Sequence, residues 1–350
     1  MKSVVVHADS RLTVEEQPAP TLSAPDEVLV RIAYSGLCGS DIPRIFASSS
    51  HFYPITLGHE FSGHVISTGE DVTDLHEGDA VACVPLLPCF QCEECRQTAY
   101  SQCKHYQFIG SRRSGGHAEF IVVSRKNLFK LPENFSLLQG AFLEPLTVGL
   151  HALKLAGGCQ GKEVIVIGAG TIGQLVIQAA SALGAKSVTA IDINPQRLAL
   201  AEETGASHVY NSATCNADDI RQQTHERRFN QLIVETAGTA QTVALSLNIA
   251  GPKAQIALVG TLHKELTLDV ATFGNILRKE LTLLGSWMNY SSPWPGSEWR
   301  QAIQLFTENK LSLEPLIASV ARPQEFIREV AALAGKPMTG KILLDMTGGR

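Results

Sequence analysis

The sequence predicts a protein of the α/β class, in which a doubly wound parallel sheet is joined to a second, β-rich domain. From about residue 145, apolar runs of strand length alternate with helical patterns, as in a parallel sheet. Before that point, short β-forming segments are separated by glycine and proline, which indicates a mainly β body. A chain of 350 residues also exceeds what one hydrophobic core usually organises, so we expect two domains.

The elements follow from local patterns. In the first part, residues 27–34 partly alternate and residues 119–123 are β-formers, so both are expected strands. The expected helices beyond residue 145 cover 146–156, 171–183 and 196–204. The strands expected there cover 163–167, 187–191, 231–235 and 255–259. A strand at 341–345 is expected to return to the first body, giving domain segments of 1–150, 151–285 and 286–350.

Composition excludes some classes of function. The chain is 44% hydrophobic and 18% charged, an ordinary globular composition. Its net charge of -5 gives no basic footprint for nucleic acid, although a local arginine cluster can still bind an anion. No apolar stretch reaches the roughly 20 residues that cross a bilayer, and no signal peptide is evident. We expect no nucleic-acid or membrane partner and a cytoplasmic location.

A dinucleotide site is predicted by the pattern G-x-G-x-x-G, formed by Gly168, Ala169, Gly170, Thr171, Ile172 and Gly173. The hexamer alone is weak evidence, but here it follows an expected buried strand and opens an expected helix. Gly168 permits the tight turn, Gly170 lets the pyrophosphate approach the backbone, and Gly173 lets helix and strand pack closely. The free N–H groups at the start of the helix then bind the phosphates.

An acidic residue predicts which dinucleotide binds. Asp192 lies 19 residues beyond Gly173, at the end of the next expected strand. Its carboxylate accepts hydrogen bonds from both ribose hydroxyls of NAD and repels the 2′-phosphate of NADP. Arg197 lies on the following helix, within reach of the adenosine ribose. We therefore predict NAD as the cofactor.

Four of the eight cysteines are crowded in one short loop, at Cys89, Cys92, Cys95 and Cys103. Four thiolates satisfy tetrahedral zinc with no position left open, so such a site holds a loop and does no chemistry. The bacterial iron–sulfur pattern has a three-residue final gap followed by proline, whereas this gap has seven residues and Lys104 follows. A redox CxxC pair would need only two cysteines. Structural zinc is the favoured interpretation.

A second set of metal-binding residue types is scattered. Cys38 lies in GLCGSD, His59 and Glu60 lie in GHEF, and Glu144 lies in LEPL. Spacing alone cannot unite them. Together, however, GLCGSD, GHEFSG, the four-cysteine loop, EPLTVGLHA and GAGTIG occur in this order, and the chain resembles the zinc-containing medium-chain dehydrogenases from end to end, nearest to their polyol dehydrogenase branch.

This resemblance implies a GroES-like, β-rich catalytic domain with two zinc sites and a Rossmann domain that binds NAD. It implies that Cys38, His59 and Glu144 hold the catalytic zinc, with Glu60 a ligand in some states or through water. Three protein ligands leave a position for substrate, whose alkoxide zinc stabilises. Ser40 stands where the family relays the alcohol proton. Many members continue this relay through a histidine at the position of Pro43, so beyond Ser40 either water or cofactor hydroxyls are expected to replace it here.

The substrate is indicated less directly. The strings SGLCGSDIPRIF, YPITLGHEFSG, ACVPLLPCF, FIGSRR and GSWMNYSSPWPG are similar to family members that oxidise galactitol 1-phosphate to tagatose 6-phosphate with NAD. At least one of Arg44, Arg112 and Arg113 is then expected to bind the phosphate, since arginine binds phosphate in bidentate fashion. The alternatives are sorbitol (free-polyol), butanediol and threonine dehydrogenases, which share the scaffold, and an inactive cofactor-binding relative. The family also suggests a homodimer or homotetramer.

Overall fold

The computed structural model describes residues 1–224, 229–336 and 338–348, and it divides into two compact units. The first unit comprises Met1–Glu144, Tyr290–Trp299 and Ile317–Arg350, and the second comprises Pro145–Asn289 and Arg300–Leu316. After Asn289 the chain thus returns to the first unit for ten residues, then to the second unit, and ends in the first. Each unit has its own buried apolar core.

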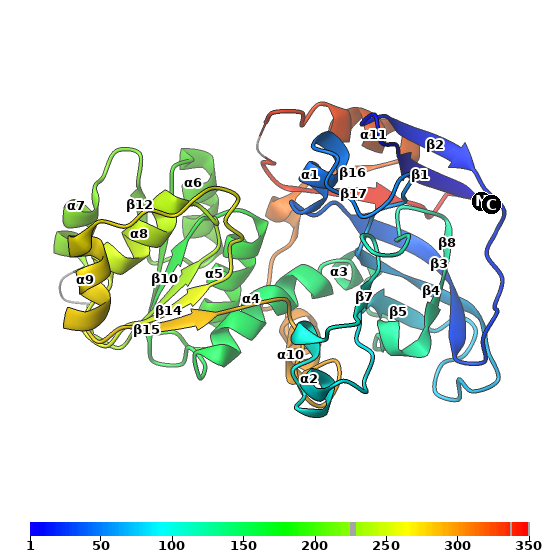
Figure 1. Cartoon of the computed structure of the whole chain (residues 1–350), viewed down its shortest axis with the longest axis horizontal. Coiled ribbons are helices and arrows are strands. Elements are labelled where there is room, and N and C mark those ends of the chain that lie inside the picture. Colours follow the sequence, from blue (N-terminus) through cyan, green and yellow to red (C-terminus); the bar gives the residue numbers. More distant parts are fainter. Residues whose placement is uncertain (225–228, 337, 349–350) are drawn as a thin grey trace. The chain divides into compact units, whose positions relative to one another are not determined.

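The first unit is a β-rich body, as the broken strand pattern predicts (Figure 1). Its main sheet has the order β16-β17-β3-β4-β5-β9, and β8 pairs with β3. The strands of this sheet are β3 (Glu27–Gly36), β4 (Glu60–Thr68), β5 (Ala80–Cys83), β8 (Phe120–Ser124), β9 (Leu128–Lys130), β16 (Ile317–Ala321) and β17 (Lys341–Asp345). Two small sheets are added by the pairs β1 (Lys2–Val6) with β2 (Leu12–Glu16) and β6 (Leu86–Leu87) with β7 (Gln107–Phe108).

Short helices fill the connections of this body. They are α1 (Asp41–Phe46), α2 (Glu93–Arg96), α3 (Leu137–Gly140) and α11 (Pro323–Ala331), with 3-10 turns η1 (Tyr100–Gln102) and η2 (Arg125–Asn127). Inward-facing residues of β3 such as Val28, Val30 and Ile32 are almost fully buried. Because β3 pairs with β4, β8 and β17, it is the central strand of this unit.

The second unit contains the doubly wound sheet. Six parallel strands have the order β12-β11-β10-β13-β14-β15, with the sequence reversing direction between β10 and β13. The strands are β10 (Glu163–Ile167), β11 (Ser187–Asp192), β12 (His208–Asn211), β13 (Gln231–Glu235), β14 (Gln255–Leu258) and β15 (Thr282–Gly285). All five residues of β10 and of β13 are buried, which explains their uninterrupted apolar runs. The predicted parallel α/β sheet is confirmed.

Helices pack against this sheet (Figure 1). The strands are contacted by α5 (Thr171–Ala182), α6 (Pro195–Thr204) and α8 (Ala240–Ile249), and α8 is contacted in turn by α7 (Ala217–Gln223) and α9 (Val270–Arg278). The remaining helical elements are α4 (Leu143–Leu155), α10 (Ser297–Thr307) and η4 (Glu314–Leu316). The observed α4 begins three residues before the helix expected at 146–156, since Pro145 is tolerated in the first turn, where its missing N–H donor costs nothing.

Candidate active site and metal centres

The four-cysteine loop lies between β6 and β7. The sulfur atoms of Cys89, Cys92, Cys95 and Cys103 all lie within 4.8 Å of one another. The Sγ–Sγ distance is 3.9 Å from Cys89 to Cys95 and 3.7 Å from Cys92 to Cys103. A tetrahedron with Zn–S bonds of about 2.3 Å has edges of about 3.8 Å, so these distances fit a closed zinc site.

Backbone donors surround the same sulfurs. The amide of Cys92 donates to the Cys89 sulfur at 3.3 Å, and the amide of Cys89 donates to the Cys103 sulfur at 3.3 Å. Backbone N–H groups of Gln91 and Cys92 lower the pKa of Cys89 to about 6. Burial instead raises the pKa of Cys95 to about 12. Cys95 therefore stays protonated at neutral pH unless a cation compensates the thiolates, and the donor set of four sulfurs fits zinc.

The second cluster is assembled by strand pairing. Cys38 follows the end of β3, whereas His59 immediately precedes β4 and Glu60 is the first residue of β4. The strands are antiparallel and place Gly36 opposite Glu60. As a result, ligand atoms of Cys38, His59 and Glu60 lie within 4.8 Å of one another, the separation that one metal ion spans. The structure thus brings together three of the residues that the sequence could not unite.

Asp41 contacts two members of this cluster, Cys38 and His59. Its buried carboxylate accepts a hydrogen bond from the Cys38 amide at 3.1 Å, and its other oxygen lies 3.8 Å from His59 Nδ1. Burial alone would lower the pKa of His59, but the negative charges of Asp41, Cys38 and Glu144 raise it to about 10. The cluster therefore favours a cation beside His59. Sulfur, imidazole and carboxylate ligands together are typical of catalytic zinc.

Glu144 lies in the first turn of α4 and is buried. It does not belong to the three-residue group with Cys38, His59 and Glu60. Its charge nevertheless acts on His59 and on the buried Tyr290, whose pKa is raised mainly by burial and further by Glu144. Glu144 is therefore within electrostatic range of the cluster.

Lys341 is a residue of this site that the sequence analysis missed. It begins β17, which pairs with β3 so that Leu343 lies opposite Gly36. The buried Lys341 ammonium donates to Glu60 Oε2 at 2.5 Å and to the carbonyl of Leu37 at 3.1 Å. Burial alone would lower the pKa of Lys341, but the Glu60 charge raises it. The sequence signal was a lysine placed directly before the apolar residues of this strand.

Ser40 and Arg44 lie on the exposed side of the cluster. Ser40 Oγ donates to the Cys38 sulfur at 3.3 Å. One guanidinium nitrogen of Arg44 donates to the Ser40 carbonyl at 2.7 Å, to Ser40 Oγ at 3.0 Å and to Asp41 Oδ1 at 3.2 Å. Arg44 is thus held against the loop that carries Cys38.

The other two arginines follow Gly110 in a segment that packs against the His59 turn. Added Cβ atoms at Gly110 and Gly115 would lie 2.8 Å and 2.2 Å from the Gly58 carbonyl oxygen, so only glycines fit this contact. Arg112 lies 4.4 Å over the Tyr106 ring and donates to its hydroxyl at 3.3 Å. The exposed side chain of Arg113 has no hydrogen bond or ion pair to any described residue.

The predicted dinucleotide loop lies in the second unit, between β10 and α5. Gly168 has φ +92°, a conformation that favours glycine, and a Cβ at Gly173 would lie 1.8 Å from the Gly168 carbonyl oxygen. A Cβ at Gly170 would meet no protein atom within 4 Å. The conformation of the loop thus requires glycine at positions 168 and 173. At Gly170 the missing side chain instead leaves open space beside the loop. Thr171 and Ile172 begin α5, where Gly170 provides no side-chain cap.

Asp192 ends β11 and is fixed at both carboxylate oxygens. One accepts a hydrogen bond from the Ala169 amide at 2.7 Å and the other from the Asn194 amide at 2.8 Å. Arg197 Nη1 lies 3.6 Å from Asp192. Asp192, Arg197 and Gly168 line a cavity of about 530 Å³ within this unit, of a size that suits part of a dinucleotide.

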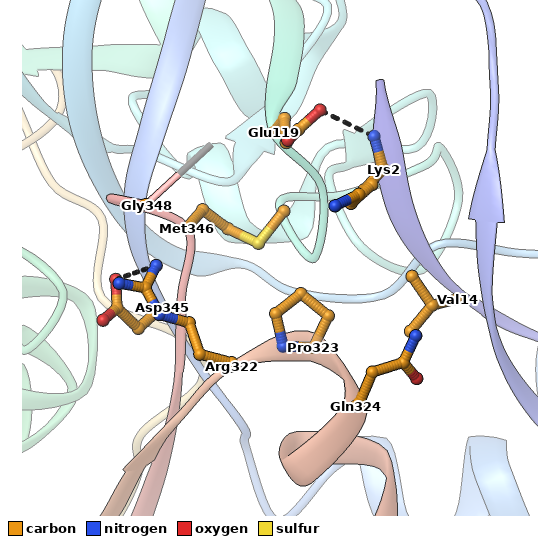
Figure 2. Close-up of a pocket in the computed structure, with 9 residues that line it drawn as sticks. All are labelled: Lys2, Val14, Glu119, Arg322, Pro323, Gln324, Asp345, Met346 and Gly348. Carbon is orange, nitrogen blue, oxygen red and sulfur yellow. Dashed lines mark hydrogen bonds and ion pairs between the residues drawn. The ribbon is translucent and has the colours of Figure 1, made fainter. Parts of the chain in front are cut away.

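A smaller cavity, of about 250 Å³, opens in the first unit at the N-terminus of α11 (Figure 2). Its lining includes Lys2, Glu119, Arg322 and Asp345, and the Arg322 guanidinium lies 3.5 Å from Asp345. None of the predicted site residues lines it. The lining carries two basic and two acidic side chains, Lys2 and Arg322 with Glu119 and Asp345, so it has no excess charge of either sign.

Comparison with known proteins now defines the class. Residues 24–133 match the alcohol dehydrogenase GroES-like domain, and residues 171–308 match the zinc-binding dehydrogenase domain. The chain belongs to the zinc-binding alcohol dehydrogenase family. The predicted fold, a GroES-like catalytic domain with a Rossmann domain, is confirmed, and so is the prediction of a dehydrogenase. The predicted cofactors, zinc and NAD, fit this family.

Particular relatives are more informative. The chain is 61% identical to galactitol 1-phosphate 5-dehydrogenase of Escherichia coli K12, over 98% of this chain and 99% of the relative. A crystal structure of galactitol-1-phosphate dehydrogenase from Escherichia coli superposes with a TM-score of 0.98 at 60% identity, covering 99% of this chain and all of that one. A probable D-xylulose reductase A of Aspergillus clavatus is 32% identical over 92% of this chain and 90% of the relative. Within the described residues, no helix is both long and apolar enough to span a bilayer.

Proposed function

We propose that this chain oxidises galactitol 1-phosphate to tagatose 6-phosphate, with NAD as hydride acceptor and one catalytic zinc ion. The observation that supports a dehydrogenase reaction in this chain is the cluster of Cys38, His59 and Glu60, which Asp41 contacts. The substrate is supported by the 61% identity, over nearly the whole of both chains, to a relative named for galactitol 1-phosphate.

We propose Cys38, His59 and Glu144 as the ligands of the catalytic zinc, with Glu60 a ligand in some states. Bound there, zinc would supply a Lewis acid that polarises the alcohol oxygen. Asp41 orients the ligands by accepting the Cys38 amide and by facing His59, and such supports sharpen metal sites. Cys89, Cys92, Cys95 and Cys103 would hold the structural zinc. Zinc analysis should find two ions per chain, and Cys95→Ser should retain only one.

For the cofactor, we propose that the glycine loop and the start of α5 bind the pyrophosphate of NAD. The free N–H groups there attract the phosphates, and Gly170 leaves them room. Asp192, held by two amides, would accept the ribose hydroxyls, while Arg197 lies beside it. The protein's part is to orient the carbinol carbon toward the nicotinamide, and NAD carries the hydride.

Of the three candidate arginines, Arg113 is the one whose charge is uncommitted, so we propose it as the main phosphate ligand. Arg44 is held by Ser40 and Asp41, and Arg112 is held by Tyr106. Arg113→Ala should lower kcat/KM for the phosphorylated polyol by about 10- to 100-fold, the usual worth of a charged hydrogen bond. An equal fall for free galactitol would refute the phosphate role.

The experiment that tests the whole proposal is a substrate panel. Zinc-loaded protein with NAD is given galactitol 1-phosphate, galactitol, sorbitol, 2,3-butanediol or threonine, and NADH is followed by absorbance. We expect the highest kcat/KM with galactitol 1-phosphate. A free polyol, butanediol or threonine as the best substrate would assign one of the alternative dehydrogenases, and no reduction with any of them would indicate an inactive relative.

The free thiols fit a reducing compartment, so we also propose a cytoplasmic location. A homodimer or homotetramer is the proposed assembly. Light scattering coupled to gel filtration would measure the mass directly.

A further inference from the structure

Arg44 is unusual among the charged residues near the metal cluster because it contacts the proposed proton carrier. It lies on α1, four residues after Ser40, and a single guanidinium nitrogen reaches both the carbonyl and the hydroxyl of Ser40. The same nitrogen is 3.2 Å from the fully buried Asp41 carboxylate. The Arg44 side chain is only 23% exposed.

We propose that Arg44 is a positioning residue, which holds the Ser40 hydroxyl in the orientation needed to take the proton of the substrate alcohol. The inference rests on the proposed dehydrogenase function and on the position of Ser40 where the family relays the alcohol proton. It assigns Arg44 a role different from binding the substrate phosphate.

The hydrogen-bonding capacity of a hydroxyl explains how this works. A serine hydroxyl has one donor hydrogen and two acceptor lone pairs. In this structure Arg44 occupies one lone pair, and the hydrogen points to the Cys38 sulfur at 3.3 Å. One lone pair therefore remains for the hydrogen of an incoming alcohol. Without Arg44, the side chain is free to choose among three staggered rotamers.

Arg44 does not itself carry the proton onward, because a guanidinium stays protonated in proteins. Pro43, in the preceding position, has no side-chain donor or acceptor. Ser40 is exposed, so once its oxygen has accepted the alcohol proton, one of the two protons that it then holds passes to solvent water and the hydroxyl is regenerated. The alcohol loses one proton to water by this route, and bound NAD would accept the hydride.

The local structure holds Arg44 in this role. The Asp41 carboxylate that accepts from Arg44 also accepts from the Cys38 amide, so the arginine and the metal-ligand loop share one buried anchor. The carbonyl of Arg44 accepts a hydrogen bond from the Tyr53 hydroxyl at 2.5 Å, which fixes the end of α1. An arginine that binds a mobile substrate phosphate would not need these restraints.

The test is a double-mutant cycle with Arg44→Met, Ser40→Ala and the combined variant, using galactitol 1-phosphate and free galactitol. We expect Arg44→Met to lower kcat about tenfold with little change in KM, since misplacing one reacting group costs about this much or more. The fall should be the same for both substrates. In the Ser40→Ala background, Arg44→Met should cost nothing further, because the hydroxyl it positions is absent. Arg44→Lys should recover part of the loss.

Arg112→Met serves as the matched control, because Arg112 is held by Tyr106 and does not contact Ser40. Arg112→Met should change kcat and KM by the same factor in wild-type protein and in the Ser40→Ala variant. The proposal is overturned if Arg44→Met costs as much in Ser40→Ala protein as in wild type. It is also overturned if the loss is a rise in KM confined to the phosphorylated substrate, which would make Arg44 a phosphate ligand.

A readout without turnover separates this inference from the proposed function. In a crystal structure of zinc-loaded Arg44→Met, we expect the Ser40 hydroxyl to leave hydrogen-bonding distance of the Cys38 sulfur, while zinc content and NAD binding stay at the wild-type level. An unchanged Ser40 rotamer would refute the positioning role, whichever alcohol proves to be the substrate.

Discussion

Replacing Lys341 with methionine tests whether its buried ion pair with Glu60 stabilises the first unit. The Lys341 ammonium lies 2.5 Å from the Glu60 carboxylate, and the two side chains are 4% and 1% exposed. Methionine keeps most of the volume of the side chain but removes its charge. Two hydrogen bonds disappear, one to Glu60 and one to the Leu37 carbonyl.

The expected cost follows from burial. Removing one partner of a buried pair leaves an uncompensated charge, which typically destabilises a protein by about 3–5 kcal/mol. Lys130 and Asp79 provide a matched control in the same unit, at a similar distance of 2.6 Å but with side chains 45% and 22% exposed. Because water screens that pair, Lys130→Met should cost about 0–1 kcal/mol.

Urea unfolding followed by tryptophan fluorescence would measure both variants, in zinc-free and zinc-loaded protein. The cost of Lys341→Met should be larger without zinc, since the ion also compensates the Glu60 charge. Adding Glu60→Gln to Lys341→Met should restore most of the loss, because the carboxylate that lost its ammonium partner is then neutral as well. If Lys341→Met costs no more than Lys130→Met, or if Glu60→Gln restores nothing, the pair does not stabilise the fold as argued.

Three further predictions follow from other sites. Asp192→Ala should lower the ratio of kcat/KM for NAD to that for NADP, because the repulsion of the 2′-phosphate is lost; an unchanged ratio would contradict the assigned role. Gly173→Ala should unfold the nucleotide loop, since its Cβ would lie 1.8 Å from the Gly168 carbonyl oxygen, and thermal melting would show this loss of stability. Gly170→Ala should fold normally but bind NAD more weakly, which a cofactor titration would measure. Burial lowers the pKa of His117 to about 4, so the unfolded chain binds more protons than the native one below about pH 6.5, and stability should fall as the pH drops from 6.5 to 4. His117→Gln should flatten that part of the stability profile, and an unaltered slope would rule this group out.

The nucleotide-binding unit was the easier half to predict, because its signals are local. The strands expected at 163–167 and 231–235 coincide with β10 and β13, since strands buried on both faces need continuous apolar sequence. The glycine pattern is equally local, because the clash of a Cβ at Gly173 with the Gly168 carbonyl involves residues five apart. Where the residues that restrict one another lie close together in the sequence, a local sequence pattern is enough to predict the structure.

The metal cluster could not be predicted from spacing, because its geometry depends on strand pairing. Cys38 and His59 are brought together by the antiparallel register of β3 and β4, which no local pattern specifies. Lys341 reaches Glu60 from 281 positions away, through the pairing of β17 with β3. Resemblance to a family supplied the ligand residues, but it did not point to Lys341 or to the contact between Arg44 and Ser40.

The end of β3 explains why these distant residues form one electrostatic unit. Gly36 lies opposite Glu60 on one side and opposite Leu343 on the other, so three separate segments converge beside the Cys38 loop. A metal-bound cysteine is a thiolate, so Cys38 contributes one negative charge and the carboxylates of Asp41, Glu60 and Glu144 contribute three. Lys341 and Arg44 supply two positive charges, which leaves two negative charges uncompensated in a buried setting. One divalent ion would neutralise them, and in its absence the cluster favours a proton on His59, whose pKa is raised to about 10.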